Sequence, residues 1–261
     1  MRKFLLAFGL VTVASALPAQ AANITPYYLF DGDAQVGYTI TNGVLTNTFT
    51  TFGLGYPVAI RDTIWLGQRD DASAREYTLG GVATGNTSVG GNNFSQLLDG
   101  AAGNGVNYGV ECCGSTNSVT SANTNWTNQQ QLFNLSFSAQ GIGFDASDST
   151  LWISELRGNT IRHYSLGGTL LGSFNLGQSL VGLAYESATD TLWGFNTSTD
   201  NLVQFNRAGG ILQDVDIAGF NPSNPFGGEM RAEATAVPEP ASMLLIGTGL
   251  AGLAARARRR R

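Results

Sequence analysis

The stretch GFDASDSTLW, residues 143–152, recurs in this sequence as AYESATDTLW, residues 184–193. The two closing tryptophans are 41 residues apart (193 − 152), and the pair Tyr164 and Phe205 keeps the same offset without a gap. Each copy has two short apolar segments joined by a turn rich in Asp, Ser and Thr. Short apolar segments that alternate with polar residues between turns indicate β-strands. The middle of the chain is therefore an internal repeat of strand pairs.

Further copies lie upstream. One ends at Trp65 and needs a single inserted residue, and Trp65 precedes Tyr77 by 12 residues, the spacing also found after the other two tryptophans. Residues 38–45 form a partial copy, and residues 94–137 fit one more unit whose sequence has drifted. Each unit predicts four strands, and Gly-Gly or Asn-Gly supplies a hairpin turn. A four-stranded unit that recurs about every 40 residues indicates a β-propeller blade.

The predicted fold is all-β, with five blades of four strands. The blades are expected at residues 26–52, 53–93, 94–138, 139–179 and 180–217. The first blade begins at its second strand, so we expect residues 227–233 to supply its missing strand and to join the two ends of the ring. That closure would remove exposed sheet edges. Six blades or an open array are the alternatives. The domain resembles β-propellers in general, including the NHL-like and lactonase-like groups.

The N-terminus has the three parts of a secretory signal peptide. Arg2 and Lys3 precede an apolar run, residues 4–13, and small residues then lead to Ala19 and Ala21. This order of a basic region, a short apolar region and an A-x-A site is typical of exported proteins. We therefore expect signal peptidase to cleave after Ala21, which makes residues 1–21 a removable segment.

The C-terminus, residues 237–261, also has three parts. Val237-Pro238-Glu239-Pro240 precedes an apolar stretch, residues 241–255. Because the two prolines prevent a helix from continuing upstream, we expect an extended, accessible segment directly before that stretch. As a helix that stretch is about 22 Å long, short of the ~30 Å hydrocarbon core, so flanking arginines and local thinning would have to cover the difference. The basic cluster that follows consists of Arg256, Arg258, Arg259, Arg260 and Arg261. It favours a short transmembrane helix with the preceding chain outside the cell. A simple tail anchor is the alternative.

These three parts, in this order, resemble the PEP-CTERM sorting signal of Gram-negative, biofilm-forming bacteria. The resemblance covers roughly the last 25 residues. It implies that a membrane-embedded exosortase-type enzyme recognises Pro238, Glu239 and Pro240, cuts nearby and passes the protein to the cell surface or the medium. The expected location is an inner-membrane-anchored precursor followed by a surface or extracellular form. The resemblance implies nothing about the central domain.

The central domain, residues 22–236, is strongly acidic. The whole chain has 14 basic and 19 acidic residues. Removing both end segments leaves 14 − 7 = 7 basic and 19 − 1 = 18 acidic residues, a net charge of −11. A domain without lysine and with this charge offers no patch for gripping phosphates, so we expect no nucleic-acid partner.

Cys112 and Cys113 are the only cysteines. In an oxidising compartment cysteines usually pair, and neighbouring cysteines can pair with each other only as a strained vicinal ring, because a trans peptide holds their Cα atoms about 3.8 Å apart. Free thiols and intermolecular bridges are the alternatives. A vicinal ring would stiffen its loop and could present a flat apolar surface to a ligand.

The sequence contains no complete catalytic set. His163 is the only histidine, which excludes sites that need several imidazoles, and its place in the repeat predicts a structural role. Asp31 with Asp33, and Asp70 with Asp71, could bind calcium through hard oxygen ligands, although neither pair has a complete loop spacing. No nucleophile elbow, phosphate loop or zinc-protease motif occurs. We therefore expect no catalytic residue, no resident metal and no organic cofactor.

Two functional hypotheses follow. The first is a non-catalytic surface or matrix module that binds exopolysaccharide or another surface protein. The second is a secreted metal-dependent propeller hydrolase or lactonase, with a central-channel metal held by Asp, Glu and Asn. The fold alone does not choose between them, because propellers host many chemistries.

Overall fold

The computed structural model describes residues 25–70, 73–89, 96–113 and 116–231. These residues form twenty strands and no helix. The strands are β1 (Tyr27–Asp31), β2 (Val36–Thr41), β3 (Val44–Thr50), β4 (Gly55–Ile60), β5 (Thr63–Gln68), β6 (Ser73–Thr78), β7 (Ala83–Val89), β8 (Leu97–Gly103), β9 (Val106–Glu111), β10 (Ser118–Ala122), β11 (Gln130–Asn134), β12 (Ala139–Asp145), β13 (Thr150–Glu155), β14 (Thr160–Ser165), β15 (Leu170–Asn175), β16 (Val181–Glu186), β17 (Thr191–Asn196), β18 (Asn201–Asn206), β19 (Ile211–Asp216) and β20 (Pro225–Met230).

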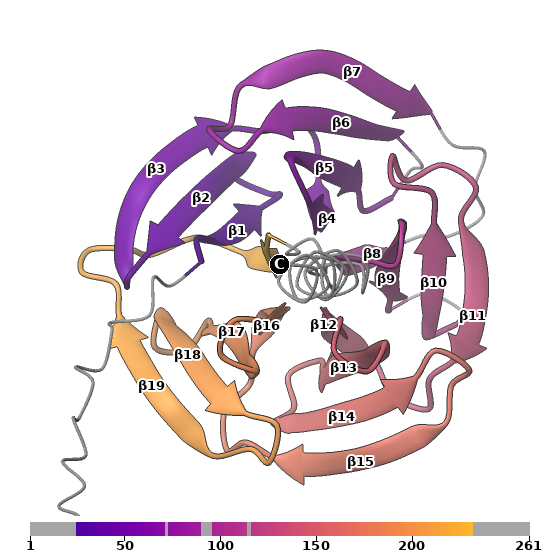
Figure 1. Cartoon of the computed structure of the whole chain (residues 1–261). Helices are drawn as coiled ribbons and strands as arrows, with labels where there is room; N and C mark the ends of the chain where they lie inside the picture. The colour runs from indigo at the N-terminus through magenta and orange to yellow at the C-terminus, as the bar shows by residue number, and fades with distance from the viewer. Residues whose placement is uncertain (1–24, 71–72, 90–95, 114–115, 232–261) are drawn as a thin grey trace, which may run out of the picture.

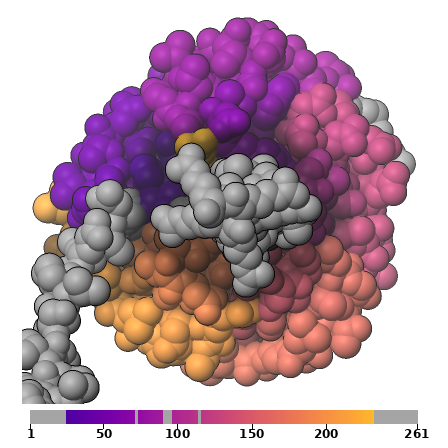
Figure 2. Space-filling view, viewed as in Figure 1, coloured from indigo at the N-terminus to yellow at the C-terminus, as the bar shows by residue number. Residues whose placement is uncertain are grey.

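The strands form five antiparallel four-stranded sheets arranged as blades around one axis (Figure 1). Blade one has the order β20-β1-β2-β3, and blades two to five are β4–β7, β8–β11, β12–β15 and β16–β19. The predicted five-bladed propeller is therefore confirmed. The expected ring closure is also present: β20 pairs with β1, with Tyr27 opposite Met230 and Tyr28 opposite Glu229. In the space-filling view the indigo and orange blades adjoin, which completes the ring (Figure 2).

The Gly-Gly turns of the repeat hold neighbouring blades together. Gly168, in the β14–β15 turn, has φ +83°, and a Cβ there would lie 2.8 Å from Phe133 of the preceding blade. Gly209 stands in the same relation to Phe174, at 2.5 Å. A backbone in the left-handed region and a close approach both require glycine. The repeated glycines thus let each outer turn press against the outer strand of the blade before it.

Blade three lacks this turn, which explains why its sequence has drifted from the repeat. Its β10–β11 connection instead buries Trp126, which is 1% exposed. The Trp126 indole donates to the Trp65 carbonyl oxygen in blade two at 3.0 Å. A Cβ on Gly100 would lie 2.6 Å from the Trp126 ring. One large side chain therefore makes the contact between blades that a Gly-Gly turn makes in blades two, four and five.

Connections alternate between the two faces of the ring because neighbouring strands run antiparallel. The first-to-second and third-to-fourth turns of the blades lie on one face, here named the terminus face, and the remaining connections lie on the opposite face. At the end of β20, Arg231 pairs with Asp62 of the β4–β5 turn at 2.5 Å. Near the start of β1, the Thr25 N–H donates to Glu186, at the end of β16, at 3.3 Å. Both ends of the described domain therefore leave from the terminus face.

Candidate functional site

The axis of the ring holds a buried carboxylate. Asp99 belongs to β8, in blade three, and its two oxygens accept backbone N–H groups from the innermost strands of three other blades. The donors are Ile142 at 2.8 Å, Leu183 at 3.0 Å and Gly228 at 2.9 Å. Each donor needs a partner because an unpaired buried N–H is costly. Asp99 therefore joins four of the five blades at one point.

Glu229 of β20 lies beside Asp99. It accepts the Ala102 N–H at 3.1 Å and the Met230 N–H at 3.0 Å. Burial raises the pKa of Asp99 well above its usual range, although four backbone N–H groups oppose the shift. Burial and the nearby Asp99 likewise raise the pKa of Glu229. Because these carboxyl oxygens already accept backbone donors, they do not form an open ligand set for the central-channel metal of the hydrolase hypothesis.

Glycines bring the inner strands close together around this pair. A Cβ on Gly227 would lie 1.8 Å from the Tyr56 carbonyl oxygen, and one on Gly182 would lie 2.8 Å from Gly228. The Tyr27 hydroxyl, fully buried, donates to the Gly182 carbonyl oxygen. Within the described ranges, no three His, Cys, Asp or Glu side chains converge as a metal site.

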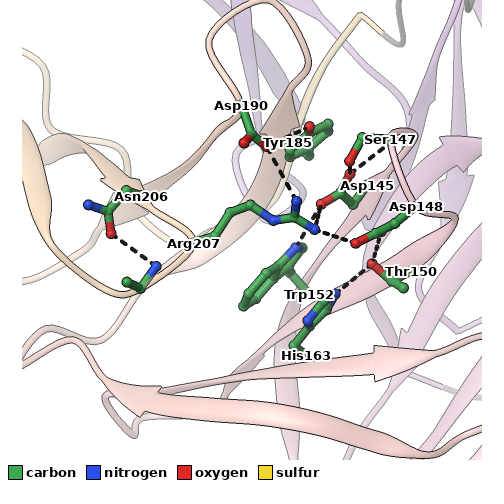
Figure 3. Close-up of polar contacts among 11 residues, drawn as sticks. Asp145, Ser147, Asp148, Thr150, Trp152, His163, Tyr185, Asp190, Asn206 and Arg207 are labelled. Atoms are coloured by element: carbon green, nitrogen blue, oxygen red, sulfur yellow. Dashed lines mark hydrogen bonds and ion pairs between the residues drawn. The ribbon is translucent and has the colours of Figure 1, made fainter.

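A second polar cluster joins blades four and five on the terminus face (Figure 3). Arg207, in the β18–β19 turn, pairs with Asp145 at 2.7 Å, with Asp148, and with Asp190 at 3.6 Å. Asp145 is fully buried, whereas Asp148 and Asp190 lie in the turns that follow β12 and β16. Burial lowers the pKa of Arg207, but the hydrogen bond to Asp148 and the nearby carboxylates outweigh it and raise the pKa.

This cluster orders side chains without leaving a free base or nucleophile. Asp145 also accepts from the Ser147 hydroxyl at 2.6 Å and from the Trp152 indole at 3.3 Å. Asp190 accepts from the Tyr185 hydroxyl at 3.0 Å. The acids are thus shared among several donors, which fits a contact between blades.

His163 lies next to this cluster, in a position that recurs in other blades. Its Nε2 is 2.6 Å from the Thr150 hydroxyl, and its ring stacks on Trp152 with centroids 3.9 Å apart. The equivalent pairs are Gln204 with Thr191 at 2.8 Å and Glu76 with Thr63 at 2.7 Å. Burial lowers the pKa of His163. Three different residue types thus make a hydrogen bond to the same threonine position of the repeat. This recurrence favours the structural role that the repeat predicts for His163.

The first candidate calcium pair lies at the ring closure, on the opposite face. Asp31 accepts the backbone N–H groups of Ser223 at 2.8 Å and Asn224 at 2.9 Å, in the segment that leads into β20. Burial would raise the pKa of Asp31, but these hydrogen bonds hold it below its usual value. Asp33 accepts from the Tyr56 hydroxyl at 2.9 Å. The pair thus fixes the segment before the closing strand and is not arranged around a vacant cation position.

The second candidate calcium pair is only half described. Asp70 binds Arg69 through two hydrogen bonds of 2.9 Å, so its carboxylate already has a cationic partner. Asp71 lies outside the described residues. The calcium hypothesis gains no support from either pair.

Cys112 and Cys113 follow β9 on the opposite face. Their Sγ atoms are 1.92 Å apart and their Cα atoms 3.8 Å apart, which is the arrangement of a vicinal bridge. Cys112 is fully buried, whereas Cys113 is exposed and has φ +69°. The Cys112 N–H donates to the Gln96 carbonyl oxygen at 3.2 Å. The redox state of the pair stays a prediction, and the geometry puts Cys113 at the surface.

The predicted sorting and cleavage residues lie outside the described residues. These are Ala19, Ala21, Val237, Pro238, Glu239, Pro240 and the five tail arginines, together with the predicted transmembrane helix. Within the part that the structure describes, no helix is long and apolar enough to cross a membrane.

Comparison with models of known protein families identifies a motif at the C-terminus. Residues 236–260 match the PEP-CTERM protein-sorting motif. The chain carries a PEP-CTERM sorting signal. This motif marks an exported, membrane-anchored precursor that an exosortase-type system processes and sorts to the cell surface. The predicted motif Val237-Pro238-Glu239-Pro240 falls inside the matched range, and of the basic cluster only Arg261 lies beyond it.

Comparisons of structure agree on the propeller. A chain in the crystal structure of a nidogen/laminin complex has a TM-score of 0.55 and 12% sequence identity, covering 81% of this chain and 86% of that one. A protein of unknown function from Bacteroides caccae has a TM-score of 0.50 and 14% identity, covering 76% of each chain. At such identities the likeness concerns the fold alone. No curated protein matches this chain in sequence.

Sequence reasoning missed Asp99 and Arg207. Asp99 is the single charge in the segment Leu-Leu-Asp-Gly-Ala-Ala, residues 97–102, and a lone acid in an otherwise apolar strand could have marked it. Arg207 has no such signal, because the corresponding position of the preceding repeat is Leu166.

Proposed function

We propose that this protein is an exported surface or matrix module that binds exopolysaccharide and has no catalytic activity. Residues 1–21 would be removed during export. The propeller domain within residues 22–236 would remain after the exosortase-type system removes the tail near residues 237–240. The observation that carries the proposal is the PEP-CTERM match at residues 236–260, because it sends the domain to the cell surface.

The arrangement of the described side chains supports binding over catalysis. Asp99, Glu229 and Asp145, which are buried carboxylates, each accept hydrogen bonds from the protein itself. Their oxygens stabilise contacts between blades, so chemistry on a substrate would require these contacts to break. The metal-dependent hydrolase alternative would need such groups to be free, and no contact in the described domain favours it.

The opposite face is the surface that remains available for a ligand, because both chain ends leave from the terminus face. Its loops expose mostly small polar side chains. Exposed residues there include Asp33, Thr116, Arg157, Asn159, Thr197, Ser198 and Thr199. Hydroxyl and amide groups can exchange hydrogen bonds with the hydroxyl groups of a sugar chain. A polysaccharide is therefore a chemically suitable ligand for this face.

The test is binding of the mature secreted protein to exopolysaccharide purified from the producing cells. Asn159→Arg introduces a bulky cation on the opposite face and is expected to change the affinity, whereas Gln213→Arg, the matched change on exposed β19, is expected to leave it unaltered. Absence of binding by the wild-type protein, or equal effects of the two substitutions, would contradict the proposal.

A further inference from the structure

The terminus face carries exposed aliphatic side chains at equivalent places in four blades. They stand at or beside the turn between the third and the fourth strand, where the repeat places the first residues of each outer strand. The residues are Val44, Val82, Leu170, Leu171, Ile211 and Leu212. All are at least 45% exposed. Six of the eight large hydrophobic side chains that are exposed in the described residues therefore lie at this one face. Exposed apolar surface that gathers at one face can serve as a contact surface.

A short linker joins the same face to the apolar segment of the sorting signal. Arg231 is held at the face by Asp62, and the apolar segment begins at residue 241. Ten residue steps span at most about 34 Å even when fully extended. The sequence therefore limits the start of the apolar segment to within about 34 Å of Arg231.

The acids on this face are only partly compensated. Asp62 pairs with Arg231, while Asp148 and Asp190 share Arg207 with the buried Asp145. Unpaired acids are repelled by anionic lipid headgroups, and ion pairing reduces that repulsion without removing it. A contact between this face and a membrane therefore has to rely on the aliphatic side chains and on the linker.

We propose that the terminus face lies against the lipid bilayer in the membrane-anchored precursor, with the exposed aliphatic side chains of the outer turns contacting lipid. The contact is weak in itself and depends on the linker, which keeps the face at a high effective concentration near the bilayer. The opposite face then points away from the membrane. Removal of the tail would end the contact and free the domain.

The two ends of β7 supply a matched test. Val82 precedes β7 on the terminus face and is 67% exposed, whereas Val89 ends β7 at the opposite face and is 85% exposed. A photo-reactive benzoylphenylalanine would replace each valine singly in the full-length precursor, reconstituted in phosphatidylethanolamine/phosphatidylglycerol liposomes. Leu171 and Leu212, 52% and 51% exposed, supply two further terminus-face positions in other blades. Each variant is first required to keep the wild-type midpoint of urea unfolding.

After illumination, mass spectrometry counts lipid adducts. We expect adducts at the three terminus-face positions to exceed those at Val89 by about fivefold, because the tail leaves from that face and the recurrent aliphatic side chains lie on it. Equal yields at Val82 and Val89, or a higher yield at Val89, would overturn the proposal. Adducts to a protein in place of lipid, when the same variants are made in the producing cells, would overturn it as well. The polysaccharide assay uses the released protein without a bilayer, so the two proposals can fail separately.

Discussion

Replacing Asp99 by Asn is expected to destabilise the whole ring. The carboxylate offers two acceptor oxygens, one to Gly228 and one shared by Ile142 and Leu183. An asparagine has one acceptor oxygen, so in its better orientation the Nδ2 group faces the Gly228 N–H. That leaves two buried donors unpaired, each costing about 1–3 kcal/mol. Removing a buried charge offsets part of this loss.

The net expectation for Asp99→Asn is a loss of about 2–4 kcal/mol in the free energy of unfolding. Urea unfolding followed by tryptophan fluorescence measures it as a lower midpoint at an unchanged m-value. Asp216→Asn, the same change at an exposed position of β19, should stay within about 0.5 kcal/mol of wild type. A stability of Asp99→Asn equal to that of this control would refute the role given to the axial carboxylate.

Three further results are expected. Burial raises the pKa of both Asp99 and Glu229, so the folded domain binds more protons than the unfolded chain at pH values between the ordinary carboxyl pKa, about 4, and the raised values. The free energy of unfolding should therefore fall as pH rises through that range. Equal stability in urea titrations at pH 5 and pH 8 would contradict this. Gly168→Ala should lower the free energy of unfolding by about 1–3 kcal/mol, because φ is +83° and the Cβ would meet Phe133. The control Gly172→Ala should be nearly neutral, because nothing lies within 4 Å of its Cβ. Thermal melts compare the two variants. Arg207→Met should lower the free energy of unfolding by about 1–2 kcal/mol, because it leaves Asp145 without its cation. Because salt screens ion pairs, 1 M salt should reduce the difference in stability between this variant and the wild type.

The blade number and the ring closure could be predicted because they depend on regularly spaced residues. Trp152 and Trp193 occupy corresponding strand positions, and Gly-Gly turns mark the start of the outer strand in blades two, four and five. Blade three could be recognised only by length, since Trp126 replaces its turn contact with one made across to blade two. A repeat alignment cannot detect that a different residue makes the equivalent contact between blades.

The axial site could not be predicted in the same way. Asp99 binds backbone N–H groups, and a backbone donor has no residue type that a sequence pattern could reveal. Its partners also lie 43 to 129 positions away along the chain, so only the closed ring brings them together. The contacts of Arg207 likewise depend on neighbouring blades. The repeated sequence therefore predicts the strands of each blade, whereas these contacts between blades form only when the ring closes.

The most direct test of the account is the intact mass of the protein that the cells release. We expect a chain that begins at Ala22, ends close to residues 237–240 and is lighter by two hydrogens than its reduced form, as a bridge between Cys112 and Cys113 requires. That mass would show that the chain between the two processed ends, which includes residues 25–231, is uncut. A released protein that still contained residues 241–261 would contradict the assignment of the tail as a sorting signal removed at the membrane.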